Sequence, residues 1–252
     1  MNKLSSLALV VLVSTVVAAG ACGSSKSEGA APASCAANGA GYDPLITPAD
    51  FSATVDNKYM PFVPGTVAMY RQSGGELVEQ DVTSDTKVIM GVKCVVVHDF
   101  LKSPSGELLE DTYDYYAQDK AGNVWYFGED TKAYSGTQVS TKGSWLAGVA
   151  CARPGIVMKG SPKAGDKYRQ EYLEGEAEDE AEVVSLDEKL TVPFGSLDHC
   201  LMTKEYTRLA PGDLENKYYC AGTFGPVSSV DVGTIDSGKR EDLLTINGKT
   251  AK

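Results

Sequence analysis

From Pro44 onward, the chain alternates short runs of strand-forming residues with turn residues. The runs are rich in Val, Ile, Thr, Tyr and Phe, and Gly, Pro, Asn and Asp separate them at intervals typical of strands and turns. One run, Cys94 to Val97, is apolar on both faces, as expected for a strand in the middle of a sheet. Helix signals are weak. We therefore predict one all-β domain over residues 44–252, in which antiparallel meanders form a curved sheet or a barrel.

The succession of runs recurs about a hundred residues further along the chain. Matching segments are Tyr70-Arg71-Gln72 with Tyr168-Arg169-Gln170, and Tyr115-Tyr116-Ala117 with Tyr218-Tyr219-Cys220. This recurrence predicts two repeated halves, residues 61–150 and 161–235, that pack or join edge to edge. The alternative is chance matching among residues that favour strands.

Residues 1–21 have the parts of a secretory signal peptide. Lys3 supplies the positive start, Leu7 to Ala19 the apolar core, and small residues precede Cys22. The apolar run is too short to cross roughly 30 Å of hydrocarbon as a helix. We therefore expect this segment to be removed, with an uncleaved anchor as the alternative.

The end of this segment, Ala19-Gly20-Ala21-Cys22, resembles the lipobox of bacterial lipoproteins, although Ala19 stands where that family usually has Leu. The resemblance implies that the Cys22 thiol receives a diacylglycerol, whose acyl chains hold the protein on a bilayer. Residues 22–43 are rich in Gly, Ser and Ala, which favours a flexible tether. The resemblance places the protein in the cell envelope. Gly23, unlike the Asp that retains lipoproteins inside, implies the outer membrane where the source has two membranes.

Five cysteines follow Cys22, and export to an oxidising compartment makes disulfides plausible without fixing their pairing. A bridge between Cys94 and Cys200 would join the two halves of the repeat. A zinc or copper site is a weaker reading, because Cys94 and His98 share one strand face and only one of His199 and Cys200 can join it. No Cys-x-x-Cys or His-x-His pattern supports that site. We predict no metal and no cofactor.

The charge balance disfavours nucleic acid as a partner. The chain has 34 Asp and Glu against 23 Lys and Arg, a net charge of −11, and no basic cluster.

Motifs of nucleophilic catalysis and of nucleotide binding are absent from the sequence: there is no Gly-x-Ser-x-Gly, no Walker loop and no Gly-x-Gly-x-x-Gly. Carboxylate pairs on one strand face do occur, for example Glu110 with Asp114, and glycosidases use two carboxylates. In so acidic a chain such pairs arise by chance. We predict that the protein is not an enzyme, with a carboxylate-dependent hydrolase as an alternative.

Aromatic side chains mark two neighbouring strands. Tyr113 and Tyr115 share one strand face, and Trp125 and Phe127 share another. Aromatic residues of this kind commonly form the core of a curved sheet. They can also line a concave surface for an apolar ligand, and these four are our candidate ligand-binding residues.

Three segments resemble a family of bacterial envelope proteins with no assigned activity, and the similarity extends from about Ile46 to Val232. The segments are Val55-Asp56-Asn57-Lys58-Tyr59-Met60-Pro61-Phe62-Val63-Pro64-Gly65-Thr66, Gly122-Asn123-Val124-Trp125-Tyr126-Phe127-Gly128-Glu129-Asp130 and Thr191-Val192-Pro193-Phe194-Gly195. The resemblance implies secretion and membership of a β-rich lipoprotein family, and it carries no reaction or ligand.

Together these features predict a non-enzymatic envelope lipoprotein that binds an envelope partner or an apolar ligand. Its partners would include the bilayer, through acylated Cys22. A structural or interaction module without a ligand cavity is the second reading, and the hydrolase is the third.

Overall fold

The computed structural model describes residues 41–234 and 236–251. The predicted signal peptide, the lipidation site Cys22 and nearly all of the predicted tether lie outside these residues. Within them, the chain is almost entirely β-structure, with one short 3-10 helix, η1 (Pro48–Asp50). No helix among the described residues combines the length and the apolar character that crossing a bilayer requires.

The strands follow one another closely along the chain. They are β1 (Phe51–Ser52), β2 (Val67–Gln72), β3 (Leu77–Ile89), β4 (Val92–Lys102), β5 (Leu108–Asp119), β6 (Val124–Ser135), β7 (Gln138–Ser140), β8 (Trp145–Leu146), β9 (Arg153–Met158), β10 (Lys167–Arg169), β11 (Glu171–Tyr172), β12 (Asp179–Val192), β13 (Gly195–Thr207), β14 (Leu214–Tyr219), β15 (Pro226–Asp231) and β16 (Arg240–Ile246).

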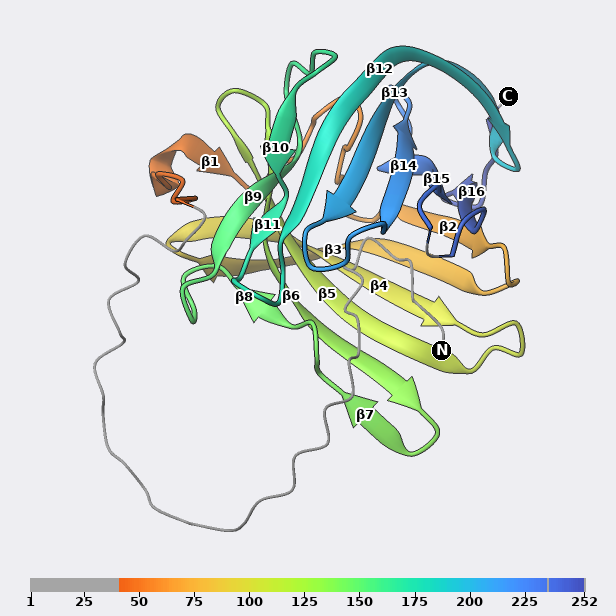
Figure 1. Ribbon diagram of the computed structural model, residues 1–252, viewed down its shortest axis with the longest axis horizontal. Coiled ribbons are helices and arrows are strands. Elements are labelled where there is room, and N and C mark those ends of the chain that lie inside the picture. Colours follow the sequence, from red (N-terminus) through yellow and green to blue (C-terminus); the bar gives the residue numbers. More distant parts are fainter. Residues whose placement is uncertain (1–40, 235, 252) are drawn as a thin grey trace.

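All of these strands belong to one antiparallel sheet. Its order is β10-β12-β13-β14-β15-β16-β2-β3-β4-β5-β6-β9-β11, while β1 pairs with β5, and β7 and β8 pair with β6. Most neighbours in the sheet are also neighbours in sequence, as in a meander. The exceptions include β16, which lies between β15 and β2 and so joins the late part of the chain to the early part (Figure 1).

Local sequence explains the long hairpins. Met90 and Gly91 both have positive φ, 50° and 79°, and they join β3 to β4 as a two-residue turn whose twist matches that of the strands. β4 then alternates side chains between two buried faces, as its continuous apolar run predicted. On one of these faces of the sheet, Phe51 packs edge-on against Trp125 and Phe127, so the segment before β2 covers the aromatic side chains of β6.

The sheet curves strongly but is not closed into a barrel. Register shifts within the β3–β4 and β12–β13 hairpins mark bulges, which bend and twist strands. The two ends of the strand order, β10 and β11, are separated by one residue, Gln170, whose backbone N–H donates to the carbonyl of Asp179 at 2.8 Å. We call the line where β9 meets β10 and β11 the seam (Figure 1).

The predicted fold class is therefore confirmed as an all-β, antiparallel, curved sheet. The proposed bridge between Cys94 and Cys200 is wrong. Cys94 lies on β4 and Cys200 on β13, with five strands between them in the sheet order, and no bond joins them. Cys200 is instead bonded to Cys220, which follows the neighbouring strand β14, with 4.2 Å between the Cα atoms. Cys94 is free and buried.

Candidate functional site

The side of the sheet toward which it curves carries a group of buried acidic side chains, which we call the inner acid cluster. Every member is at most 7% exposed, and the members come from strands across the whole sheet: Asp99, Glu110, Asp114, Glu129, Glu171, Glu205 and Glu241. Carboxylates are rarely buried to this extent unless they are paired or protonated. This cluster is the most unusual chemical feature of the described chain.

Strand register brings the acidic side chains together. Asp114 on β5 lies directly opposite Glu129 on β6, and alternation places Glu110 on the same face of β5 as Asp114. Neighbouring polar groups satisfy part of the cluster. Gln80 donates an amide hydrogen to Asp99 Oδ2 at 2.7 Å, and the Tyr126 hydroxyl donates to Asp114 Oδ1 at 2.6 Å.

One lysine enters the cluster. Lys217 Nζ lies 2.9 Å from Glu205 Oε2 and 3.3 Å from Glu215 Oε2, so two carboxylates share this cation. Those carboxylates raise the pKa of Lys217 well above its ordinary value against the opposing effect of burial. Asp99, Asp114, Glu129 and Glu171 form no ion pair with any described residue.

Burial and mutual repulsion raise the pKa values of these unpaired acids. Burial is the largest cause for Asp99, Asp114, Glu129 and Glu171, and other carboxylates of the cluster add to it. At Asp114 the Tyr126 hydroxyl opposes the rise. Burial also raises the pKa of Glu241 to about 8. The folded interior therefore favours the protonated forms of these side chains more than water does.

The four predicted ligand-binding aromatics do not line this cluster. Phe127 and Trp125 pack against Phe51, and the Trp125 indole donates to Asp119. Tyr115 is buried and donates to Asp130, whereas Tyr113 is 37% exposed and stacks on His98 with ring centroids 3.9 Å apart.

The weak metal candidates are dispersed. His98 bonds to Asp111, exposed His199 bonds to Asp187, Cys200 is in a disulfide, and Cys94 is buried. No three His, Cys, Asp or Glu side chains in residues 41–234 and 236–251 gather in a way that could hold a metal ion.

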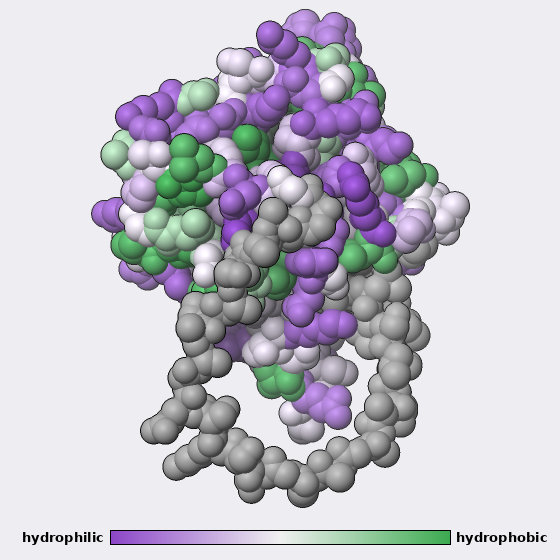
Figure 2. Space-filling model, turned by 60° about the vertical axis from the view of Figure 1, so that its left-hand side comes forward, coloured by the Kyte–Doolittle hydropathy of each residue, from purple (hydrophilic) through white to green (hydrophobic). Residues whose placement is uncertain are grey.

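Outside the cluster, the surface is mostly hydrophilic with separate hydrophobic patches (Figure 2). One patch consists of Val88, Met90 and Val149, which are 68%, 41% and 59% exposed. The Met90 side chain lies against Gly148, the neighbour of Val149, so these residues of distant segments adjoin. A hollow of about 430 Å³ lies at the β12–β13 hairpin and shares no residue with the inner acid cluster.

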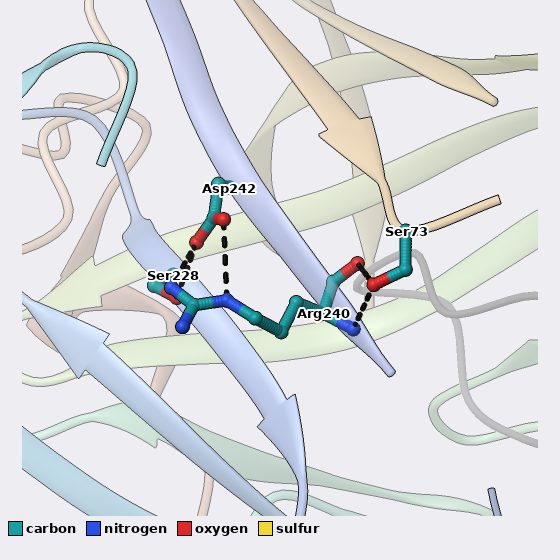
Figure 3. A network of polar contacts seen from close by, with 4 residues as sticks. All are labelled: Ser73, Ser228, Arg240 and Asp242. Carbon is teal, nitrogen blue, oxygen red and sulfur yellow. Dashed lines mark hydrogen bonds and ion pairs between the residues drawn. The ribbon is translucent and has the colours of Figure 1, made fainter. Parts of the chain in front are cut away.

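A polar network on the opposite face of β16 from Glu241 is structural in character. Arg240 contacts Asp242 through two nitrogens, at 2.8 and 3.2 Å, and Ser228 donates to the same carboxylate at 2.6 Å (Figure 3). The Arg240 backbone N–H donates to the Ser73 hydroxyl at 2.8 Å. Its charges cancel internally, so the network connects β15, β16 and the β2–β3 turn.

Sequence reasoning placed Glu110 and Asp114 on one face but took the pair for chance. The missed signal is the position of these acids along the strands. Within β5 and β6, the acids Glu110, Asp114 and Glu129 lie on the same strand face as buried Thr112 and Thr131. The position of an acid on an inward strand face indicates whether its side chain is buried. The total number of acids in the sequence does not.

Comparison with known proteins gives little. No protein-family model matches the chain, and no curated protein matches it. Among solved structures, it is similar to a protein described as a "putative lipoprotein" from Parabacteroides distasonis ATCC 8503, with 12% sequence identity and a TM-score of 0.44 over 75% of this chain and 97% of that one. Similarity at this level identifies neither a family nor a function.

Proposed function

We propose that the protein is a non-enzymatic lipoprotein of the cell envelope, anchored through acylated Cys22, that acts by binding a partner at its outer surface. The anchor rests on the signal-peptide pattern and on the lipobox-like segment Ala19-Gly20-Ala21-Cys22. Nothing in this proposal requires a cofactor.

The observation that carries surface binding is the filling of the inner face. Large side chains such as Tyr70, Tyr116, Tyr219 and Phe62 are fully buried, and the inner acid cluster is buried among residues of this kind. An apolar ligand on this face would displace packed rings and leave ionisable groups against hydrocarbon, which is costly. The filled interior therefore favours a partner at the surface over an apolar ligand inside.

The hydrolase remains the weaker candidate. Asp114 and Glu129 are two facing carboxyls with raised pKa values, as a pair of acid and base would be. Each is only 1% exposed, however, so a substrate does not reach them in this conformation.

Metabolic labelling tests the anchor. Cells that express the full chain are grown with labelled palmitate, and the label should enter the protein and disappear in Cys22→Ala. Cys94→Ala is the matched control and should remain labelled, because Cys94 is buried in the folded domain. An unlabelled wild-type chain that is exported normally would refute the anchor.

Site-specific photo-crosslinking tests the partner. A crosslinking residue at Val149, in the apolar patch, should capture a defined envelope protein in intact cells. The same residue at Val139 on β7, an equally exposed valine outside the patch, should not. Native mass spectrometry of the protein from its own cells provides the opposing result: a lipid that co-purifies in fixed stoichiometry would favour the apolar-ligand reading instead.

A further inference from the structure

Buried polar atoms without hydrogen-bond partners gather at one place in the sheet. Most of those in the described residues lie on strands beside the seam: Glu129 Oε2, Trp145 Nε1, Tyr168 Oη, Arg169 Nη1, Glu171 Oε1 and Asp179 Oδ1. The remaining one, Gln80 Oε1, lies on β3. Native interiors pair nearly all such groups, so this concentration marks the seam as the least satisfied part of the fold.

The seam also has the weakest backbone connection. Elsewhere, the long strands pair along most of their length apart from bulges, as β3 does with β4 and β12 with β13. At the seam, β11 pairs with β9 over two residues and β10 pairs with β12 over three. The turn from β11 to β12 is held by the Gln170–Asp179 backbone bond and by the Leu173–Ala177 pair, whereas β11 and β9 have only their two-residue pairing and the packing of Gly155 against the Gln170 backbone among the described contacts.

Glu171 is the acid at the centre of the seam, and charged or titratable groups face it from several elements. They are Asp114 on β5, Tyr126 and Glu129 on β6, Asp179 on β12 and Lys217 on β14. Glu129 additionally faces Asp99 and Glu110, and Asp179 faces Glu205 and Glu215. The indole N–H of Trp145 on β8 is near enough to Glu171 to lower the pKa of that carboxyl. The distance and angle between the two groups do not meet those of a hydrogen bond.

The one cation among these groups is already engaged. Lys217 makes ion pairs with Glu205 and Glu215, which together carry more negative charge than it neutralises. Ionisation of Glu129 and Glu171 would thus place two further negative charges in a buried region where Lys217 already faces Glu205 and Glu215. Repulsion between such charges is strong where water is excluded.

We propose that the seam is a pH-operated joint, closed while Glu129 and Glu171 hold their protons and opened, by separation of β11 from β9, when they ionise. Separation admits water to the two carboxylates and to the unpaired groups around them. Opening releases protons, so the open population rises with pH. The remainder of the sheet, from β12 through β16 to β6, stays paired in both states.

The raised pKa values support the direction of this joint. Burial, Asp114 and Glu171 raise the pKa of Glu129, and burial and Asp179 raise that of Glu171. The closed state therefore binds protons more tightly than the open state, in which both side chains regain ordinary values near 4.3. Closure is therefore favoured at low pH and weakens as the pH rises.

Trp145 offers a local reporter, because it lies beside Glu171 and is 4% exposed. The full chain with Trp125→Phe retains Trp145 as its single tryptophan. We expect its emission to shift to longer wavelength, and its quenching by acrylamide to rise at least twofold, between pH 5.5 and pH 9. The variant Glu129→Gln/Glu171→Gln in the same background should show neither change.

Glu241→Gln serves as the matched control, because Glu241 is an equally buried acid with a raised pKa on β16, away from the seam. It should leave the Trp145 titration unchanged. A titration that survives in the double variant, that disappears equally in Glu241→Gln, or that is missing from the parent chain would overturn the joint.

Hydrogen exchange of the unmutated chain gives an independent result that does not depend on whether the variants fold. Peptides covering β9 to β11 should lose protection between pH 6 and pH 8.5 after correction for the intrinsic pH dependence of exchange. Peptides covering the β3–β4 hairpin should not. Equal loss in both regions would indicate global destabilisation and would refute a local joint.

Discussion

Asp114 illustrates how a single side chain in this protein depends on its neighbours. It is 1% exposed and forms no ion pair, and its described hydrogen bond is the one from the Tyr126 hydroxyl. Burial raises its pKa, and this hydrogen bond opposes the rise by favouring the ionised form. The tyrosine thus limits how strongly the residue resists ionisation.

Removal of that hydroxyl should therefore be costly. We expect Tyr126→Phe to lower the free energy of unfolding by about 1–3 kcal/mol, since a buried acceptor loses its donor. Urea unfolding at pH 7 measures this change. Tyr113→Phe, at a half-exposed ring with no described hydroxyl contact, should change stability by less than about 0.5 kcal/mol. Equal effects of the two variants would show that the hydroxyl does not support Asp114.

Glu241 gives the clearest dependence on pH at this scale. Its pKa rises to about 8 in the folded protein, so the folded state binds a proton that the unfolded state releases near pH 4.3. Stability from this group is consequently greatest below pH 4.3 and falls as the pH rises toward 8, by up to about 1.4 kcal/mol per unit.

In Glu241→Gln the slope of unfolding free energy against pH between 5 and 8 should be shallower than in the parent chain. The amide oxygen can still accept the Gln72 hydrogen bond that the carboxylate accepts at 3.0 Å, so the substitution tests charge rather than shape. Denaturation with urea at several pH values provides the measurement. Parallel slopes in the two proteins would contradict a raised pKa at this position.

At the scale of elements, β13 and β14 are tied by a disulfide that the sequence left open among many pairings. Cys200 and Cys220 could not be paired in advance, because pairing depends on which strands become neighbours, and that in turn depends on register and turn geometry. The presence of individual strands was easier to predict than the disulfide pairing. The run from Cys94 to Val97 has the continuous apolar character of a central strand, and β4 is one.

We expect Cys200→Ala/Cys220→Ala to lower stability by about 3 kcal/mol, the chain-entropy estimate for a loop with a sequence separation of 20. Cys151 also takes part in a disulfide bond. Thermal unfolding without reductant measures the change in stability and leaves that second bond intact. Cys94→Ala is the control for the loss of a thiol. Because Cys94 is buried and burial raises its pKa to about 12, its thiol should also resist alkylation until the chain unfolds.

The seam depends on a close approach between β9 and the residue that joins β10 to β11. A Cβ atom at Gly155 would lie 2.3 Å from the Gln170 carbonyl carbon, which is backbone and cannot rotate away. We expect Gly155→Ala to destabilise the protein by about 1–3 kcal/mol and to reduce hydrogen-exchange protection in β9 to β11 first. Gly74→Ala, where a Cβ atom would meet only the movable side chain of Glu76, controls for the loss of a glycine. Uniform loss of protection would argue against a local effect.

At the scale of the whole molecule, the sequence predicted an all-β curved sheet and did not predict what its inner face contains. Alternation and turn residues act locally, so they are readable from the chain. Burial of Asp99, Asp114 and Glu129 arises only when distant strands curve around one interior. An acid on a strand face has the same appearance in sequence whether that face meets water or another part of the sheet.

The predicted repeat, the signal peptide and the lipidation at Cys22 stay predictions, the last two because they fall outside the described residues. The ligand-binding role of Tyr113, Tyr115, Trp125 and Phe127 also stays a prediction, although the structure places their rings away from the inner acid cluster. The patch of Val88, Met90 and Val149 and the seam can be tested separately. Crosslinking tests the patch, and tryptophan emission tests the seam.

The position of β16 has a consequence for biogenesis. This strand is translated last of the sixteen, yet it occupies the middle of the sheet between β15 and β2. Until residues 240–246 are available, β2 and β15 each lack one of their two neighbouring strands, however early the preceding hairpins form. The complete sheet can therefore form only after the last strand of the chain has been synthesised.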